Sequence, residues 1–194
     1  MNYLGHFYLS FLLDNNPLFT TGVFMADDIK GKKILDNFPE KIRDGIIFHR
    51  ICDTYIDNHS MTNEALETLR PILSKWAPVA IDIYWDHFLA SNFSFLTGLN
   101  LTSFSKDRLN HVLENFSFLP LVSKKRWFYL YSENLPVAYA DLTMMEMVFK
   151  RMHKRIKLDN KLNLAYEVLM ENYEFLENLS LEFWKSSIDY FLGK

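Results

Sequence analysis

The residues best suited to chemistry lie between Asp82 and Phe88, where two carboxylates and an imidazole interrupt an aromatic, apolar run. On a helix, Asp82 and Asp86 lie one turn apart on nearly the same face, and His87 lies about 100° round from Asp86. Burying two carboxylates beside Trp85 without partners is costly unless a cation, a metal or protonation neutralises them. The stretch therefore has either one wet edge or a positive charge in front of it.

A second polar group lies within residues 39–58, where His49, Asp53 and Asp57 recur every four residues. On a helix this spacing makes one polar stripe, and Arg50 can reach Asp53 along the same helix. By itself the stripe is more typical of a solvated helix face that carries an ion pair. It becomes informative only beside the other polar groups.

Two smaller groups have ordinary explanations when each is taken alone. Asp27 and Asp28 stand shortly before Gly31, as solvated charges at a helix end do. His6 lies between apolar residues near the start of the chain, where a lone histidine is more often part of the core. Their types matter because the same two side chains, aspartate and histidine, recur in the two groups above.

Together, histidines and aspartates on at least four separate helices predict a divalent metal site in a helical bundle. Carboxylate and imidazole ligands suit manganese, iron, magnesium or zinc. The only cysteine is Cys52, so a disulfide framework and a cysteine-based zinc site within the chain are excluded. A metal held in this way polarises phosphoryl oxygen and lowers the pKa of bound water, which points to a metal-dependent phosphohydrolase.

Helical periodicity dominates the chain, so we expect an all-α fold: one compact bundle of about eight or nine helices over residues 1–194. Strand signals are poor, with no sustained alternation of apolar and polar residues. The expected helices cover about residues 2–13, 20–29, 39–58, 62–71, 78–96, 102–116, a segment after Pro120, 141–152, and 163–192 with a break near Ser180.

Composition predicts a soluble, folded protein, since 49% of the residues are hydrophobic and charged residues make up 23%. The net charge of −3 gives no reason to expect a nucleic-acid or membrane partner. The N-terminus lacks the basic region of a signal peptide, and no run approaches the roughly 20 apolar residues of a membrane span. We therefore expect a cytoplasmic protein.

Four segments, residues 1–6, 22–31, 45–58 and 77–89, resemble the acyl carrier protein phosphodiesterases, also called holo-acyl-carrier-protein hydrolases. The clearest match runs from Ala77-Pro78 through Asp82 to Trp85-Asp86-His87-Phe88-Leu89. The four segments occur in order and with similar spacing, so the resemblance covers nearly the whole chain.

The resemblance implies hydrolysis of the phosphodiester that links 4′-phosphopantetheine to a serine of holo-acyl carrier protein, by metal-activated water. It implies an HD-phosphohydrolase-like enzyme with a divalent cation, Mn²⁺ first, with Mg²⁺, Fe²⁺ or Zn²⁺ as alternatives. The implied metal ligands are His6, Asp27, Asp86 and His87. The implied catalytic residues are His49 and Asp53, as acid/base groups or further metal ligands. Arg50 is implied to neutralise phosphate charge, and Asp82 to orient one of the metal ligands.

Two positions depart from the family pattern. Tyr8 stands where the family often has a second histidine, and Asp28 stands where it usually has phenylalanine. The first change removes either a metal ligand or a side chain that would contact a metal ligand. The second adds negative charge beside the site.

Two basic clusters, Lys124–Arg126 and Lys150–Lys157, stand out in a chain that is net negative. Acyl carrier proteins are small and acidic, so these clusters are expected to steer and orient one as the protein partner. Solvated helix ends explain each cluster equally well. The alternatives for the whole chain are a phosphohydrolase of a small nucleotide or other phosphodiester, and a helical binding protein without catalysis.

Overall fold

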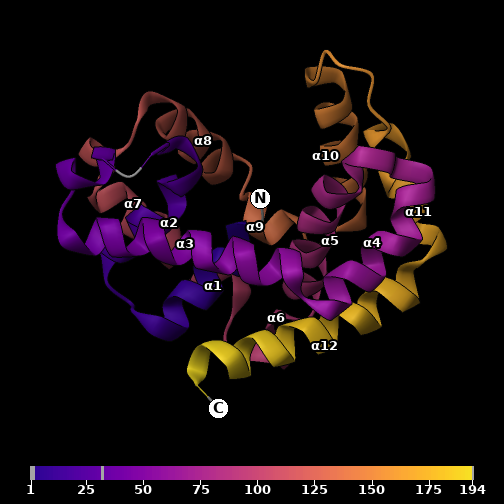
Figure 1. The fold of residues 1–194 in the computed structure, drawn as a ribbon, viewed down its shortest axis with the longest axis horizontal. Helices are drawn as coiled ribbons and strands as arrows, with labels where there is room; N and C mark the ends of the chain where they lie inside the picture. Colours follow the sequence, from indigo (N-terminus) through magenta and orange to yellow (C-terminus); the bar gives the residue numbers. More distant parts are fainter. Residues whose placement is uncertain (1–2, 32, 194) are drawn as a thin grey trace.

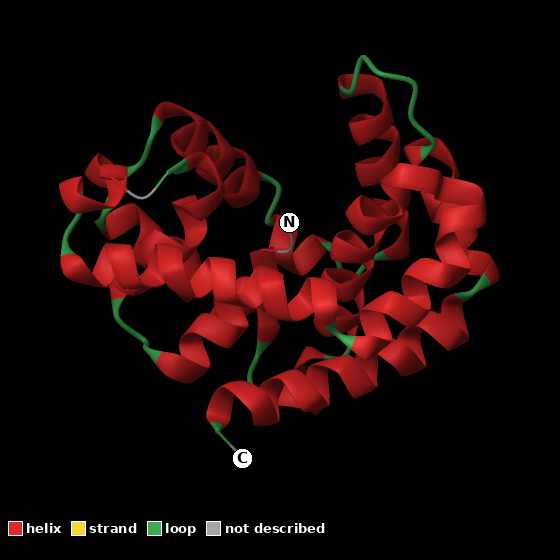
Figure 2. Ribbon diagram, in the orientation of Figure 1, coloured by secondary structure: helices red, strands yellow, loops and turns green. Residues whose placement is uncertain are grey.

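The structure, a computed structural model, describes residues 3–31 and 33–193, and these ranges contain helices and no strand (Figure 1 and Figure 2). The prediction of an all-α fold is confirmed. The longer helices are α1 (Tyr3–Leu13), α2 (Pro17–Met25), α3 (Glu40–Asn58), α4 (Ser60–Leu73), α5 (Ala77–Ser91), α7 (Leu101–Glu114), α8 (Leu121–Ser132), α10 (Leu142–Arg155) and α12 (Tyr173–Leu192). The short ones are α6 (Phe93–Thr97), α9 (Leu135–Ala138), α11 (Ala165–Glu171) and the 3₁₀ turns η1 (Ala26–Asp28), η2 (Lys33–Asn37), η3 (Ser74–Trp76), η4 (Phe116–Phe118) and η5 (Leu162–Leu164).

Helix boundaries are the part of the sequence prediction that needs correction. The second helix begins at Pro17 and not near Thr20, because the Asn16 side chain accepts the Leu18 N–H at 2.9 Å and caps it. The C-terminal segment breaks at Asn172 and not near Ser180, which is buried inside α12. Short helices such as α6 and α9 raise the helix number above the expected eight or nine. Asn2, the expected first helical residue, lies outside the described residues.

Helix α5 lies at the centre of the core and is buried on almost every side. Its sequence is apolar all round, as expected of a helix enclosed by others. Trp85 has no exposed surface, and its ring stacks on Phe183 of α12 with centroids 5.6 Å apart. The Trp184 indole N–H donates to the Trp85 carbonyl at 3.1 Å. The Asp86 carboxylate and the His87 imidazole of α5 are thus enclosed by protein.

Two glycines allow α2 and α3 to approach closely. A Cβ on Gly45 would lie 2.2 Å from the Phe19 carbonyl oxygen, and one on Gly22 would lie 2.1 Å from the Ile42 carbonyl oxygen. Such distances are impossible for a side chain, so the crossing requires glycine on both helices. Because η1 follows α2 directly, this close crossing brings Asp27 next to the middle of α3.

Candidate metal centre

Four side chains from three elements meet at one point. The His6 Nε2 of α1 lies 3.1 Å from Asp53 Oδ1 of α3. The His49 Nε2, also on α3, lies 3.2 Å from Asp27 Oδ1 of η1 and 3.3 Å from Asp53 Oδ2. The two imidazole rings stack with centroids 3.9 Å apart, and the Nε2 atom of each contacts one carboxylate oxygen of Asp53. Helix periodicity explains the α3 pair, since His49 and Asp53 are one turn apart.

The cluster is closed on one side and open on the other. The side chains of His6 and His49 are 5% and 3% exposed, whereas those of Asp27 and Asp53 are 33% and 46% exposed. The imidazoles therefore form a rigid wall, and the carboxylates face solvent. A substrate can approach the cluster from the carboxylate side.

The charges in the cluster support one another. Burial disfavours the charged form of His49, but hydrogen bonds to Asp27 and Asp53 outweigh it and raise the pKa of His49 to about 9. Burial works against ionised Asp53 as well, but its contacts with His49 and His6 hold the pKa of that carboxyl well below its usual range. The pKa of Asp27 is also lowered by its hydrogen bond with His49, against the effect of burial. Both carboxylates are ionised at neutral pH.

This donor set suits a divalent cation. His6, His49 and Asp53 each offer one ligand atom, and these atoms all lie within 4.8 Å of one another. A metal with bonds of about 2.1 Å holds its ligands within roughly 4.2 Å, so small side-chain rotations suffice. Nitrogen and carboxylate oxygen ligands without thiolate match the harder first-row metals and magnesium. The donor set therefore fits a divalent metal, and of the four ligands expected from the sequence it includes His6, with Asp27 at its edge.

Asp86 lies elsewhere and has a structural partner. Its carboxylate has no exposed surface and accepts the backbone N–H groups of Leu4 and Gly5, each at 2.9 Å. These are two of the N–H groups that the first turn of a helix leaves without an internal acceptor. Asp86 thus caps α1 from another helix and fixes the helix that carries His6. We therefore replace the expected role of metal ligand with that of a positioning residue.

His87 is also occupied by the protein itself. Its Nδ1 lies 2.7 Å from the Tyr139 carbonyl oxygen, and its Nε2 lies 3.0 Å from the Tyr173 hydroxyl. The side chain is fully buried, and burial lowers its pKa, so the ring is neutral. With both nitrogens hydrogen-bonded, it has no free lone pair for a metal. His87 ties α5 to the segment around α9 and to α12.

Arg50 and Asp82 lie beside the cluster without being part of it. The Arg50 Nη2 donates to the Ile29 carbonyl at 2.8 Å, which fastens the chain after η1 onto α3. Asp82 acts electrostatically on Asp57, whose pKa is raised first by burial and then by Asp82 and Asp53. These contacts give Arg50 a positioning role and place Asp82 along the acidic edge of α3.

The two departures from the family pattern have separate explanations. Tyr8 is 4% exposed and packs edge-on against Phe93 and Phe104, so it belongs to the aromatic core. Asp28 accepts a hydrogen bond from the Ser123 hydroxyl at 2.5 Å and from Arg126 Nη2 at 3.0 Å. It therefore faces α8, and its charge is balanced there. Sequence reasoning missed this link, because nothing in the spacing shows which cation meets Asp28.

Comparison with known proteins shows which family the chain belongs to. The family model described as acyl carrier protein phosphodiesterase matches residues 1–187. A protein of that name from Klebsiella pneumoniae (strain 342) is 30% identical over 186 residues, covering 95% of this chain and 93% of the relative. Relatives of the same name from Yersinia pestis and Photorhabdus laumondii are 28% and 26% identical, covering 95% of this chain and 94% and 91% of their own lengths. No solved structure matches significantly. The chain belongs to the acyl carrier protein phosphodiesterase family.

Proposed function

We propose that this protein hydrolyses the phosphodiester between 4′-phosphopantetheine and the serine of holo-acyl carrier protein, releasing apo-acyl carrier protein and 4′-phosphopantetheine. The observation that carries the proposal is the cluster of His6, His49, Asp53 and Asp27, found in a chain of this family. Phosphodiester hydrolysis requires positive charge beside the phosphoryl oxygens and an activated water, and this donor set is suited to hold the necessary cation.

His6, His49 and Asp53 would hold the divalent metal, with Asp27 as a further ligand. The metal would take the place of the proton that His49 Nε2 shares with Asp27 and Asp53, because a ligating imidazole must be deprotonated. Mn²⁺ is the first candidate, with Mg²⁺, Fe²⁺ or Zn²⁺ as alternatives. When bound, such a cation polarises phosphoryl oxygen and acidifies a neighbouring water. Asp27 is partly exposed to solvent and lies outside the triad of His6, His49 and Asp53, so it would accept the proton that the attacking water loses.

Other residues of the chain position this machinery. Asp86 holds the start of α1 and thereby His6, while Arg50 holds the segment after η1 and thereby Asp27. The imidazoles are almost completely enclosed, so water reaches the cluster only from the carboxylate side. These contacts keep the donor atoms in place before substrate arrives, which lowers the cost of organising the reaction.

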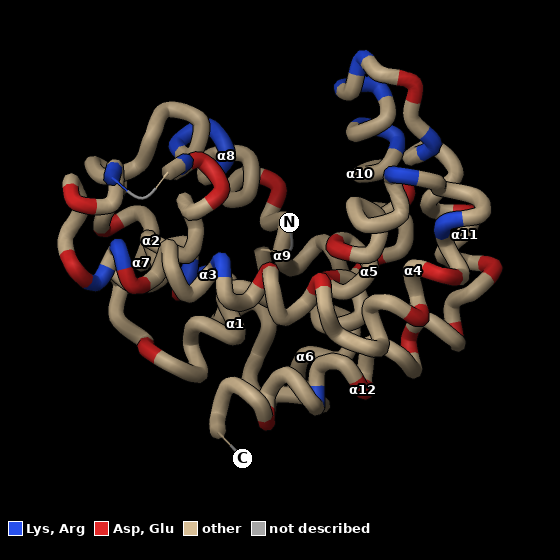
Figure 3. The backbone as a smooth tube through the Cα atoms, in the orientation of Figure 1, with Lys and Arg blue, Asp and Glu red and all other residues tan. Residues whose placement is uncertain are grey.

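The basic clusters are proposed to receive the acidic carrier protein. Figure 3 shows Lys and Arg residues along α8 and around the C-terminal end of α10. Residues of both helices line the same pocket. Complementary charge on two facing helices both steers and orients an acidic partner. No helix of the described residues is long and apolar enough to cross a membrane.

The decisive experiment is incubation with holo-acyl carrier protein and Mn²⁺, with the carrier followed by intact mass. Loss of the mass of the phosphopantetheine group supports the proposal, and unchanged carrier refutes it. We expect His49→Ala and Asp53→Asn to reduce turnover by roughly 10³-fold or more, because each removes a proposed metal ligand. Leu113→Ala, at an exposed position of α7, serves as the control and should retain wild-type turnover.

A further inference from the structure

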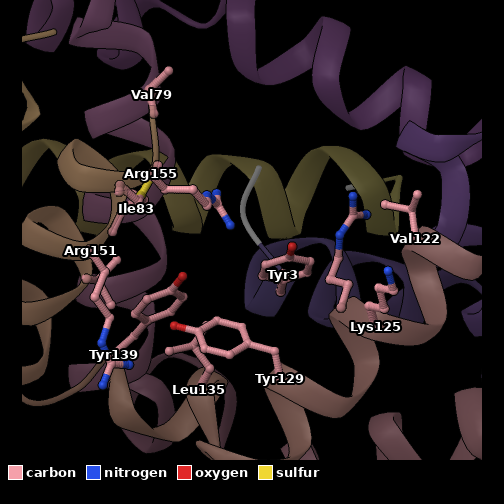
Figure 4. A pocket seen from close by; sticks show the side chains of 13 residues that line it. Tyr3, Val79, Ile83, Val122, Lys125, Tyr129, Leu135, Tyr139, Arg151 and Arg155 are labelled. Atoms are coloured by element: carbon pink, nitrogen blue, oxygen red, sulfur yellow. The ribbon is translucent and has the colours of Figure 1, made fainter. Parts of the chain in front are cut away.

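A cavity of about 620 Å³ lies between α8 and α10, close to the metal cluster but outside it. Its walls also include residues of α1, α5 and α9 (Figure 4). The size falls within the range of pockets that enclose a small organic ligand, which is about 300–1,000 Å³. None of the four cluster residues lines it, so it is a feature separate from the cluster.

The charge of this cavity changes from its mouth to its floor. Lys125 of α8 and Arg151 and Arg155 of α10 are exposed at the mouth. Among the described residues, Lys125 and Arg155 form no ion pair, whereas Arg151 lies 3.5 Å from Glu133. Figure 4 shows the Arg155 guanidinium extending into the cavity toward Tyr3. The mouth therefore offers uncompensated positive charge to an anionic partner.

The floor is apolar, with one aromatic hydroxyl. Ile83, Leu135 and Val148 are 4%, 3% and 6% exposed, and Tyr139 closes the floor beside them. Such a lining favours an uncharged chain with methyl groups and a few hydrogen-bonding atoms. A fully charged ligand would lose its hydration there without replacement. Mouth and floor thus suit different parts of one substrate.

Tyr3 connects the cavity to the metal cluster. It lines the cavity and stands three residues before His6 on α1, one helical turn away. Burial raises the pKa of Tyr3 to about 12, and Arg126 and Asp27 are close enough to act on it. Arg126 also lines the cavity while its Nη2 contacts Asp28, the neighbour of Asp27. A ligand in the cavity can therefore reach the cluster with one end.

We propose that the cavity between α8 and α10 binds the pantetheine arm of the substrate, with the thiol end of the arm on the apolar floor. The phosphate end lies toward Tyr3, and the acidic carrier protein to which the phosphate is bonded lies at the basic mouth. This rests on the proposed function, since that function supplies a substrate in which a phosphodiester joins an uncharged arm to an acidic protein. The arm carries two amides, a pair of methyl groups and a thiol, and it matches the apolar floor. The floor side chains then become specificity determinants for what the arm carries.

The test uses the full-length protein and two probes: holo-acyl carrier protein for turnover by the Mn²⁺-loaded protein, and free pantetheine for binding by saturation-transfer NMR with diamagnetic Mg²⁺ in place of Mn²⁺. Val79→Trp and Met152→Trp place a large ring in the cavity at half-buried positions of its wall. Leu113→Trp adds the same ring on an exposed face of α7 and is the matched control. Far-UV circular dichroism and the urea midpoint identify which variants are folded.

We expect both wall variants to lose the saturation-transfer signal of the pantetheine methyl groups and roughly tenfold or more in kcat/KM, because the arm can no longer lie in reach of the cluster. Leu113→Trp should keep both. Arg155→Glu should raise the KM for the carrier while leaving the pantetheine signal intact, because it changes only the mouth.

Two results would overturn the inference: no saturation transfer from the wild-type protein, or wild-type kcat/KM and signal in the folded wall variants. Failure of the proposed function looks different. In that case the wild-type protein leaves the holo-carrier intact, and pantetheine binding that the wall variants abolish would still support an arm-binding cavity.

Discussion

Replacement of Asp86 distinguishes a helix cap from a metal ligand. Its buried carboxylate accepts the N–H groups of Leu4 and Gly5, each at 2.9 Å. Asp86→Ala leaves both donors buried without an acceptor, at about 1–3 kcal/mol each, so we expect the free energy of unfolding to fall by about 2–6 kcal/mol. Asp86→Asn retains one acceptor oxygen, so a loss of about 1–3 kcal/mol is expected. Burial raises the pKa of Asp86 to about 7, which offsets part of the loss by removing a costly buried charge.

Urea unfolding followed by circular dichroism at about pH 8, with and without Mn²⁺, measures this effect. The matched control is Asp53→Asn, a change at a half-exposed position of the cluster. Asp53→Asn should lose the rise in midpoint that Mn²⁺ causes, because it removes a proposed metal ligand. Asp86→Asn should lower the midpoint and retain the Mn²⁺ effect. A stable Asp86→Asn protein that no longer responds to Mn²⁺ would refute our interpretation and restore Asp86 as a ligand.

Two further predictions concern the fold. Burial lowers the pKa of folded His87 below the ordinary 6.5. Below pH 6.5, His87 therefore takes up a proton in the unfolded chain before it does so in the folded chain. The stability that is present above pH 6.5 is then lost as the pH falls. The urea midpoint of His87→Gln should fall less than that of wild type between about pH 7.5 and about pH 5.5, and equal slopes would contradict the assignment. Gly45→Ala should destabilise the protein by about 3 kcal/mol or more, since its Cβ would lie 2.2 Å from the Phe19 carbonyl oxygen. It should also reduce Mn²⁺ binding in calorimetry, because separating α2 from α3 moves Asp27 from the cluster; an unchanged affinity would show that the crossing does not set the site.

Local pattern was sufficient to predict the class of fold and the kind of chemistry. Apolar residues at helical spacing, with poor strand signals, already indicated an all-α chain. The spacing of His49 and Asp53 placed two donors on one face of α3, and this needs no tertiary information. Helix ends were harder, as at Pro17, because a cap depends on side-chain orientation. The choice of His6 and Asp27 as companions came from the resemblance together with their residue types.

The tertiary structure decided which polar residues belong to the cluster. The sequence of α5 shows a carboxylate and an imidazole in an apolar helix, and both a metal and a protein partner satisfy that pattern. Only the packing shows that the first turn of α1 ends against Asp86 and that Tyr139 and Tyr173 contact His87. These partners are 52 to 86 residues away in the chain, beyond the reach of helical periodicity. Residue type and spacing thus determine what a side chain is able to bind, whereas the packing of distant helices determines which partner it meets.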